Sequence, residues 1–425
     1  KEPDEKLLQT VANKIVWNIW QMDGLKDTVP LGKPYEEYPQ MVLDGVFPER
    51  SIIAEKELEA IPSKVYDWRR DNSILFNKLK ERNVMGHKLF NFVIGNPPYQ
   101  EHVSGAKRNF SLSKQLFPIF IKESIKVGDK IMLITPSRWF TGDAQDKSFL
   151  KLREFIQKNN HIKYLCNYPD AKEVFQNAEI KGGVNFFLYD SNYIGKIQFD
   201  IFQHGKRTSE IRNLFELGLD VIISDRTTYS ILSKVIYSKG FKTITEITKG
   251  RNAFGIIGKE NVLNEKSKKD YFDGAIKLFC KAGDIRWTTR SDITKGKDIL
   301  DKYKVFISKS AGSPGKDLKV IGTPYVGERG SACTDSLFPI GGFDTKEEAE
   351  NLSKYMQTRF LRFMVSIMKM SQNVTQVVYK FVPLKNFSSA SDIDWSKSVH
   401  EIDLQLYRKY GLDEKEIAFI ESHVK

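Results

Sequence analysis

The chain has 425 residues, of which 40% are hydrophobic, so it is too long for one ordinary domain and can form two or three apolar cores. Charged residues make up 28% of the chain and include both signs, with a formal net charge of +12. This surplus of positive charge suits a nucleic-acid partner. The three scattered cysteines, Cys166, Cys280 and Cys333, exclude a disulfide framework and a zinc-binding spacing, and no apolar run reaches membrane-spanning length, so we expect a cytoplasmic protein that contacts no membrane.

The N-terminal pattern predicts a helix over 4–20 that passes into a short strand over 18–22. This strand ends at Asp23. Asp23 has two interpretations, a ligand contact or simply the start of a turn, and the sequence alone favours neither. The stretch 30–89 contains Pro34, Pro39, Pro48 and Pro62 and predicts an irregular insertion.

The most informative stretch is 92–99, an apolar strand that runs directly into Asn96-Pro97-Pro98-Tyr99. Two consecutive prolines fix the backbone in an extended form, and neither has an N–H, so the nearby carbonyls can face a ligand. The Asn96 side-chain oxygen and the Pro97 carbonyl then form two preset acceptors, which suit the two N–H donors of an exocyclic amino group. Tyr99 adds an aromatic face on which a flat heterocycle can stack.

The alternative for these four residues is an ordinary strand end with a Pro-Pro turn and an aromatic plug. Their position argues against it, because the strand looks buried, and open α/β sheets bind ligands at the carboxyl ends of their strands. The sequence therefore predicts a ligand site at Asn96 to Tyr99.

Strands and helices alternate after this turn. A polar loop over 100–109 contains Lys107 and Arg108, and a helix is predicted over 112–126. The further elements are predicted as strand 130–137, helix 149–158 and strands 162–166 and 184–189, which complete the sheet. This spacing is typical of a parallel sheet with crossover helices.

A weak nuclease-like pattern lies at Pro169-Asp170 and Glu179-Ile180-Lys181. A nuclease would need Asp170 and Glu179 to converge on a metal ion. The spacing is loose and the pattern is common, so we expect no metal site and place both carboxylates on a surface loop.

The pattern changes near residue 211. Short strands are predicted over 241–247 and 303–308, separated by basic loops that contain Gly, Ser and Tyr. Cations with small neighbours suit phosphates and base edges, although each loop alone could be ordinary solvated surface. The residues predicted to contact DNA are Lys107, Arg108, Arg138, Lys249, Arg251, Lys309, Lys316 and Arg329.

The C-terminal part predicts one strong helical segment over 345–368 and a strand over 373–384. Two helices follow in 393–424. The first is predicted to start at Asp394-Trp395-Ser396, and the second is capped by Asp413.

Ile94 to Tyr99, together with the strand at Lys130 to Trp139, resembles the DNA N6-adenine methyltransferases of restriction-modification systems. The detailed likeness is to type II, IIG-like enzymes with gamma-type motif order and a TaqI-like specificity domain.

The resemblance implies methyl transfer from S-adenosylmethionine to an adenine flipped out of double-stranded DNA. It implies that Asn96, Pro97, Pro98 and Tyr99 form the catalytic motif, and that Asp23 contacts the cofactor. Tyr99 is a candidate to stack on the base, and so are Phe186, Phe187 and Tyr189 of the last strand. The pleat places Phe186 on the face opposite to Phe187 and Tyr189, and the sequence does not choose among the three; a core role is expected for at least two of them.

The fold class we predict is α/β, with an incomplete Rossmann-like methyltransferase sheet followed by a mixed α+β target-recognition domain. The domains are 1–210, the C-terminal part of the methyltransferase domain; 211–390, target recognition; and 391–425, a helical tail. The family's glycine-rich cofactor loop has no match, because the glycine clusters at 312–315 and 327–330 lack a strand-loop-helix setting.

Two expectations follow from the missing loop. An N-terminal region, which could also carry a nuclease, or a separate chain should supply it, and these 425 residues alone should show little turnover. The competing hypothesis is a DNA-recognition module whose methyltransferase half is not catalytic. The target DNA sequence cannot be derived, because base readout depends on the three-dimensional placement of a few side chains.

Overall fold

A computed structural model of the chain describes residues 64–67, 72–75, 88, 90–101, 114–142, 147–176, 180, 182–311, 320–369 and 374–424. The chain divides into two compact units. The first comprises Lys1–Thr135, Asn160–Leu165 and Phe186–Gln198, and the second Pro136–Asn159, Cys166–Asn185 and Phe199–Lys425. The predicted helix 4–20 and strand 18–22 lie outside the described residues. No helix within the described ranges is both long and apolar enough to cross a bilayer.

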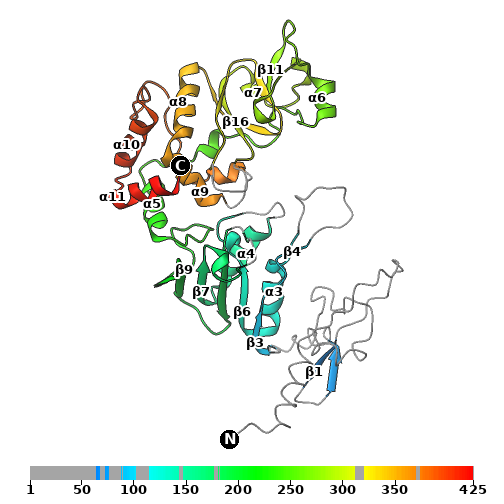
Figure 1. Ribbon diagram of the computed structural model, residues 1–425, viewed down its shortest axis with the longest axis vertical. Helices are drawn as coiled ribbons and strands as arrows, with labels where there is room; N and C mark the ends of the chain where they lie inside the picture. Colours follow the sequence, from blue (N-terminus) through cyan, green and yellow to red (C-terminus); the bar gives the residue numbers. More distant parts are fainter. Residues whose placement is uncertain are drawn as a thin grey trace, which may run out of the picture. The chain divides into compact units, whose positions relative to one another are not determined.

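A six-stranded sheet has the strand order β10-β9-β7-β8-β6-β3. Its strands are β3 Phe90–Gly95, β6 Gly128–Pro136, β7 Ile162–Tyr168, β8 Val184–Asp190, β9 Ile197–Gln203 and β10 Lys206–Arg212. The strands predicted at 130–137, 162–166 and 184–189 are confirmed. The parallel pairing of β3 with β6 places Gly95 opposite Leu133. Both strands therefore end at the same edge of the sheet (Figure 1).

The strand before the Pro-Pro turn was expected to be buried, and this expectation is wrong. Phe92 is 61% exposed and Ile94 is 75% exposed. Phe92 and Ile94 are two residues apart and therefore share one face of β3, and this face is open to solvent.

The sheet was predicted to end with the strand at 184–189, but it continues into β9 and β10. Only His204 and Gly205 connect these two neighbouring strands, and both have positive φ values, 53° and 70°. A two-residue turn of this kind makes an antiparallel hairpin, so the sheet is mixed and not purely parallel.

Two helices follow strands β3 and β6 along the chain. Helix α3, Phe117–Val127, has Pro118 in its first turn and buries Phe117, Ile121 and Ile125 at helical spacing. Helix α4, Ser148–Asn159, confirms the prediction at 149–158. The helix predicted from residue 112 begins five residues later, because Lys114–Gln115 form strand β5, which pairs with β4, Gln100–Glu101.

The rest of the chain builds two small sheets and a helical layer. The sheet order β12-β11-β15 joins Ile285–Thr288, Ile276–Phe279 and Ser331–Cys333, and the order β14-β13-β16 joins Tyr325–Gly327, Tyr303–Ser308 and Leu337–Phe343. The helices are α5 Arg226–Ile236, α6 Glu260–Lys266, α7 Lys297–Leu300, α8 Lys346–Gln357, α9 Arg359–Met368, α10 Val399–Lys409 and α11 Glu414–His423. A separate antiparallel pair is β1 Lys64–Asp67 with β2 Asn72–Leu75. The strand predicted at 303–308 is confirmed.

One large core unites the helices with β13 and β16. It contains side chains of α5, α8 and α9 and of both tail helices, α10 and α11. In Figure 1 these helices lie on one side of β16, and the small lobe with α6 and β11 lies on the other. That lobe has its own core around Leu263, Leu278 and Phe306.

Two predicted strands in this half are wrong. Residues 241–247 contain a 3-10 turn at Ile244–Ile247, capped by the Thr243 side chain. Residues 373–384 contain another at Gln376–Tyr379. Most of their apolar side chains, among them Ile244, Val378 and Tyr379, are buried in the helical core, and an isolated bridge joins Thr243 to Pro383.

The predicted helical segment 345–368 is two helices that divide at Thr358. The Thr358 side chain caps α9, and the Asp403 carboxylate accepts from the N–H groups of Arg359 and Phe360. The cap at Asp413 is confirmed, since its side chain accepts from Glu416. The helix predicted from Asp394 begins instead at Val399 with Ser398 as its cap, because Asp394 binds Ser396 within a turn.

Candidate active site

The Asn96-Pro97-Pro98-Tyr99 turn is held at both ends. It leaves β3 directly after Gly95, and it enters β4, where Gln100 pairs with Gln115. The backbone N–H of Leu116 donates to the Tyr99 carbonyl at 3.1 Å, which extends this pairing by one residue into the turn. The turn is therefore a fixed element between strand β3 and helix α3.

Asn96 and Pro97 present two open acceptors. Pro97 is buried while Asn96 is exposed, and within the described part of the chain no hydrogen bond is made to the Asn96 side chain or to the Pro97 carbonyl. Neither Pro97 nor Pro98 has an N–H group, so neither proline can donate to these oxygens. The pair can accept two N–H groups from a ligand.

Tyr99 combines a packed ring with an unsatisfied hydroxyl. Its ring meets Phe117 edge-on, with the ring centroids 6.5 Å apart and an interplanar angle of 81°. The hydroxyl is buried and has no hydrogen-bond partner among the described residues, and burial raises the pKa of the phenol. An unpaired buried hydroxyl costs free energy, so it is a candidate to bind a ligand atom.

A buried polar cluster lies where β6, β7 and β8 meet their loops. The Ser137 hydroxyl donates to Asn167 Oδ1 at 2.6 Å, and Asn185 Nδ2 donates to the Ser137 hydroxyl at 3.3 Å. The Ser137 N–H also donates to the carbonyl of Gly183, a residue with φ of 79° at which any Cβ would collide with the Tyr168 carbonyl. Sequence reasoning missed this cluster, although Ser137 lies inside the strand-loop motif that it singled out.

The loop after β6 is anchored by arginine side chains. Arg138 was predicted to contact DNA. Its guanidinium lies 5.7 Å from the Phe149 ring centroid, and burial lowers its pKa. Arg153, which the sequence reading did not select, is buried and donates to the carbonyls of Trp139 and Gly142 at 2.8 and 2.7 Å and to that of Asp220. The loop conformation is thus set by helix α4.

The aromatic residues of β8 are mainly part of the core. Phe187 is fully buried. Tyr189 is also buried, and its ring centroid lies 5.3 Å from that of His161. Phe186 is half-buried and packs against Tyr164 at 5.6 Å. The expected core role for at least two of them is confirmed, and base stacking by Phe187 or Tyr189 stays a prediction.

Four of the basic residues predicted to contact DNA are paired with carboxylates or carbonyls, namely Lys249, Arg251, Lys309 and Arg329. Lys249 forms an ion pair with Asp298 at 2.9 Å. The Asp335 carboxylate forms ion pairs with both Arg251, at 2.9 Å, and Lys309, at 3.8 Å. Arg329 donates to the Asp344 carbonyl at 2.8 Å. The structure therefore brings Arg251 and Lys309 together on one carboxylate. The other predicted site residues, Asp23, Lys107, Arg108 and Lys316, lie outside the described residues.

Comparison with known proteins finds one family model that matches part of the chain. Residues 41–175 match the Eco57I restriction-modification methylase family, a range that contains both Asn96 to Tyr99 and Lys130 to Trp139. An uncharacterized adenine-specific methylase of Mycoplasma pneumoniae is 33% identical over 190 residues, which cover 43% of each chain. The chain thus spans less than half the length of this relative.

Solved structures of restriction-modification enzymes also align with the chain, with low scores. The type IIG restriction endonuclease BpuSI aligns with 85% of this chain and 55% of its own, at 13% identity and a TM-score of 0.34. The type IIL restriction-modification enzyme MmeI, in complex with DNA, aligns with 78% of this chain and 56% of its own, at 10% identity and a TM-score of 0.39.

Proposed function

We propose that this chain carries the base-binding side of a DNA adenine-N6 methyltransferase from a restriction-modification system. The observation that carries the proposal is the rigid turn after β3, in which the Asn96 side chain and the Pro97 carbonyl are both open acceptors. The match of residues 41–175 to a restriction-modification methylase family supports it. So does the similarity to an adenine-specific methylase.

The chemistry follows from these acceptors. In a duplex the adenine amino group is paired and out of reach, so the base must leave the helix. Asn96 and the Pro97 carbonyl then accept its two N–H bonds, which draws the nitrogen lone pair out of conjugation with the ring and directs it away from the two acceptors. Tyr99 stacks on the base and offers its unpaired hydroxyl.

The methyl donor implied by this activity is S-adenosylmethionine, which supplies an electrophilic methyl group when it is bound. The residues near Asn96 fit the amino group of the acceptor base. The one residue assigned to the donor, Asp23, lies outside the described residues, so the described part of the chain defines the acceptor side of the reaction.

The second half of the chain, 211–390, is assigned to target recognition. Its lobes carry basic loops on an overall basic chain, and double-stranded DNA is the partner that suits this charge. A type IIG-like parent enzyme with gamma-type motif order and a TaqI-like recognition domain is the detailed assignment that we retain.

The proposal is tested in a bacterial host that lacks adenine methylation. The complete reading frame that contains this chain is expressed there, and N6-methyladenine in the host DNA is measured by mass spectrometry. We expect the modified base with the natural gene and its loss with Asn96→Ala. If the protein binds DNA but neither gene yields N6-methyladenine, the alternative of a non-catalytic recognition module is supported.

A further inference from the structure

The lobe built on β11 and β12 carries a row of two lysines and a tryptophan. Lys277 lies directly opposite Trp287 in the antiparallel β11–β12 pair. On the other side of Trp287, Lys268 and Trp287 exchange two backbone hydrogen bonds of 2.8 Å. Residues directly opposite each other in antiparallel strands share one face, so Lys268, Trp287 and Lys277 form a continuous row.

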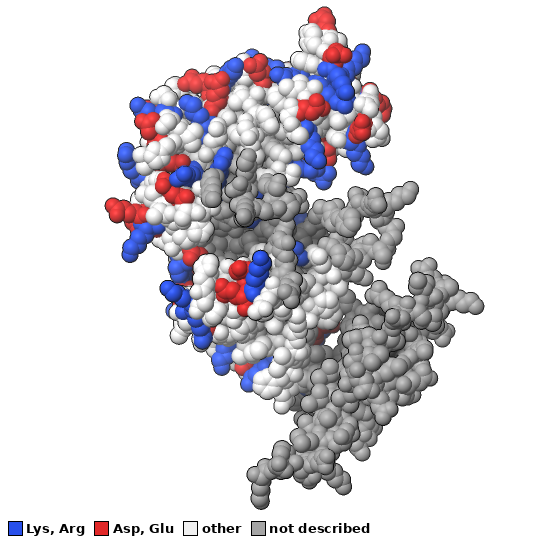
Figure 2. Space-filling model, viewed as in Figure 1, with Lys and Arg blue, Asp and Glu red and all other residues white. Residues whose placement is uncertain are grey.

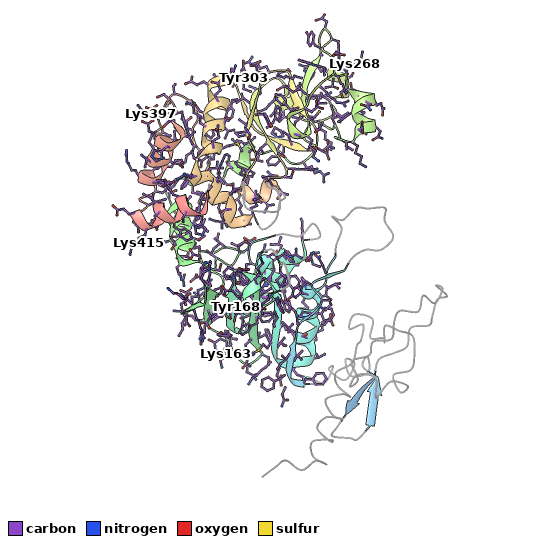
Figure 3. The ribbon with its side chains drawn as sticks, in the orientation of Figure 1. Lys163, Tyr168, Lys268, Tyr303, Lys397 and Lys415 are labelled. Carbon is purple, nitrogen blue, oxygen red and sulfur yellow. The ribbon has the colours of Figure 1, made fainter. Side chains whose placement is uncertain are left out.

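An exposed tyrosine adds to this row. The Tyr271 ring is 62% exposed and meets Trp287 edge-on, with the centroids 4.9 Å apart and an interplanar angle of 83°. We call Lys268, Tyr271, Lys277 and Trp287 the aromatic–basic face. Figure 2 shows Lys and Arg side chains on the lobe that contains this face, and Figure 3 labels Lys268 there.

The lysines of the aromatic–basic face are free of carboxylate partners within the described residues. Lys268 Nζ lies 5.2 Å from the Phe272 ring centroid, and Lys277 Nζ lies 5.4 Å from that of Phe279. Asp270 and Asp273 belong to the same loop, yet neither forms an ion pair with these lysines. By contrast, Lys249 and Arg251 in the loops that the sequence favoured are paired with aspartates.

We propose that the aromatic–basic face contacts the phosphate backbone of double-stranded DNA. Two unpaired ammonium groups beside flat rings suit phosphates and sugars, because neutralised phosphates release their counterions. Protein–protein interfaces are depleted in lysine, which disfavours a protein partner for this row. The inference rests on the proposed function, since it takes DNA as the substrate of this chain.

The test measures the salt dependence of DNA binding by the full chain. Binding to a fluorescently labelled duplex of mixed sequence is followed by anisotropy at several salt concentrations. The test variant is Lys268→Gln/Lys277→Gln. The control is Lys397→Gln/Lys415→Gln, which removes the same charge from two exposed lysines without ion-pair partners in the described tail (Figure 3).

We expect the test variant to bind about tenfold or more weakly near 0.1 M salt, with the slope of log K against log salt reduced by about 0.9 for each lost phosphate contact. The control should keep the natural slope. Equal affinity and slope in the test variant and the natural chain would overturn the proposed surface. If the double variant does not keep the natural circular dichroism spectrum, the single variant Lys268→Gln, at the exposed lysine, is tested in its place. The expected change in the salt slope is then half as large, because one lysine is lost instead of two.

The outcome also separates this inference from the proposed function. A natural chain that binds no duplex at any salt concentration contradicts DNA as the substrate, and both proposals fail. A natural chain that binds duplex normally, with no effect of the lysine changes, contradicts the aromatic–basic face alone.

Discussion

The Leu116 N–H donates to the Tyr99 carbonyl at 3.1 Å, and this bond joins the end of the Pro-Pro turn to the start of helix α3. Leu116 is the residue before the helix, and the next residue, Phe117, packs against the Tyr99 ring. Backbone and ring contacts therefore fix the aromatic before any ligand arrives. A site with this much internal support loses little conformational entropy when a base binds.

Asn96 is the residue whose loss should separate catalysis from DNA binding. In Asn96→Ala one of the two acceptors for the amino group is removed, so we expect methylation to fall by about 100-fold or more, as for the loss of one preorganised polar contact in an active site. Because the side chain is exposed and has no partner among the described residues, the unfolding free energy should change by less than about 0.5 kcal/mol.

Methylation is measured as N6-methyladenine in host DNA, and binding by anisotropy. The matched control is Asn213→Ala, another exposed asparagine, which should keep full methylation. Natural methylation in Asn96→Ala would show that the turn is not the catalytic motif.

Tyr99 should act through its ring more than through its hydroxyl. In Tyr99→Phe the ring contact with Phe117 remains and a buried, unpaired hydroxyl is removed, so the unfolding free energy should stay equal or rise by about 1 kcal/mol. In Tyr99→Ala the stacking surface is lost, at a cost of about 1–3 kcal/mol in base capture. Urea unfolding and methylation assays on both variants check this order. A Phe variant as inactive as the Ala variant would assign the main role to the hydroxyl.

The Pro-Pro turn and its neighbouring strands were predictable because their signals are local. Two prolines restrict the backbone wherever they occur, and β6, β7 and β8 are rich in apolar residues and bounded by turn residues. The β9–β10 hairpin also had a local signal, the glycine of His204-Gly205 directly after the alternating stretch 197–203, which the sequence reading did not use. The open acceptors at Asn96 and Pro97 follow from the same local chemistry.

The features that the sequence did not predict depend on contacts between residues far apart in the chain. The apolar run near Val378 was expected to be a strand, but it packs as a turn in a core made by helices elsewhere in the chain. The carboxylate partners of Lys249 and Arg251 lie 49 and 84 residues away, so no local pattern could show that these cations are paired. The two-residue strands β4 and β5, which hold Tyr99, are too short for any periodicity.

Arg153 should be a major source of stability for the loop after β6. It is 3% exposed and donates to three backbone carbonyls, those of Trp139, Gly142 and Asp220. In Arg153→Met these carbonyls lose their donor, so we expect the unfolding free energy to fall by about 3 kcal/mol. The measurement is urea unfolding followed by circular dichroism. Lys158→Met, at an exposed position on the same helix, is the control and should change stability by less than about 0.5 kcal/mol.

Cofactor binding by these 425 residues should be weak. The sequence contains no glycine-rich loop in a strand-loop-helix setting, which is the element that the resemblance assigns to S-adenosylmethionine. Isothermal titration of the purified 425 residues should give a Kd well above the micromolar range. Micromolar binding would contradict this prediction and would place the cofactor contacts within the chain, starting with Asp23.

Lys304 should make the stability of the second unit depend on pH. Its side chain is fully buried and donates to the carbonyls of Ile299, Leu300 and Lys302 at 3.0, 2.7 and 2.9 Å. Burial lowers the pKa of this amine from 10.5 to about 7. Between these two values the unfolded chain holds a proton that the folded chain has released, so the unfolding free energy should rise as the pH increases from about 7 to about 10.5, by at most about 1.4 kcal/mol per pH unit.

The variant Lys304→Met lacks the titrating amine and should lose this part of the pH dependence. The free energies of unfolding of the natural chain and the variant are compared in urea at a series of pH values from neutral to alkaline. Their difference should grow in favour of the natural chain as the pH rises, because only the natural chain gains from releasing the Lys304 proton. A difference that stays constant across the series would mean that Lys304 remains protonated in the fold, held by its three carbonyl acceptors at the end of helix α7.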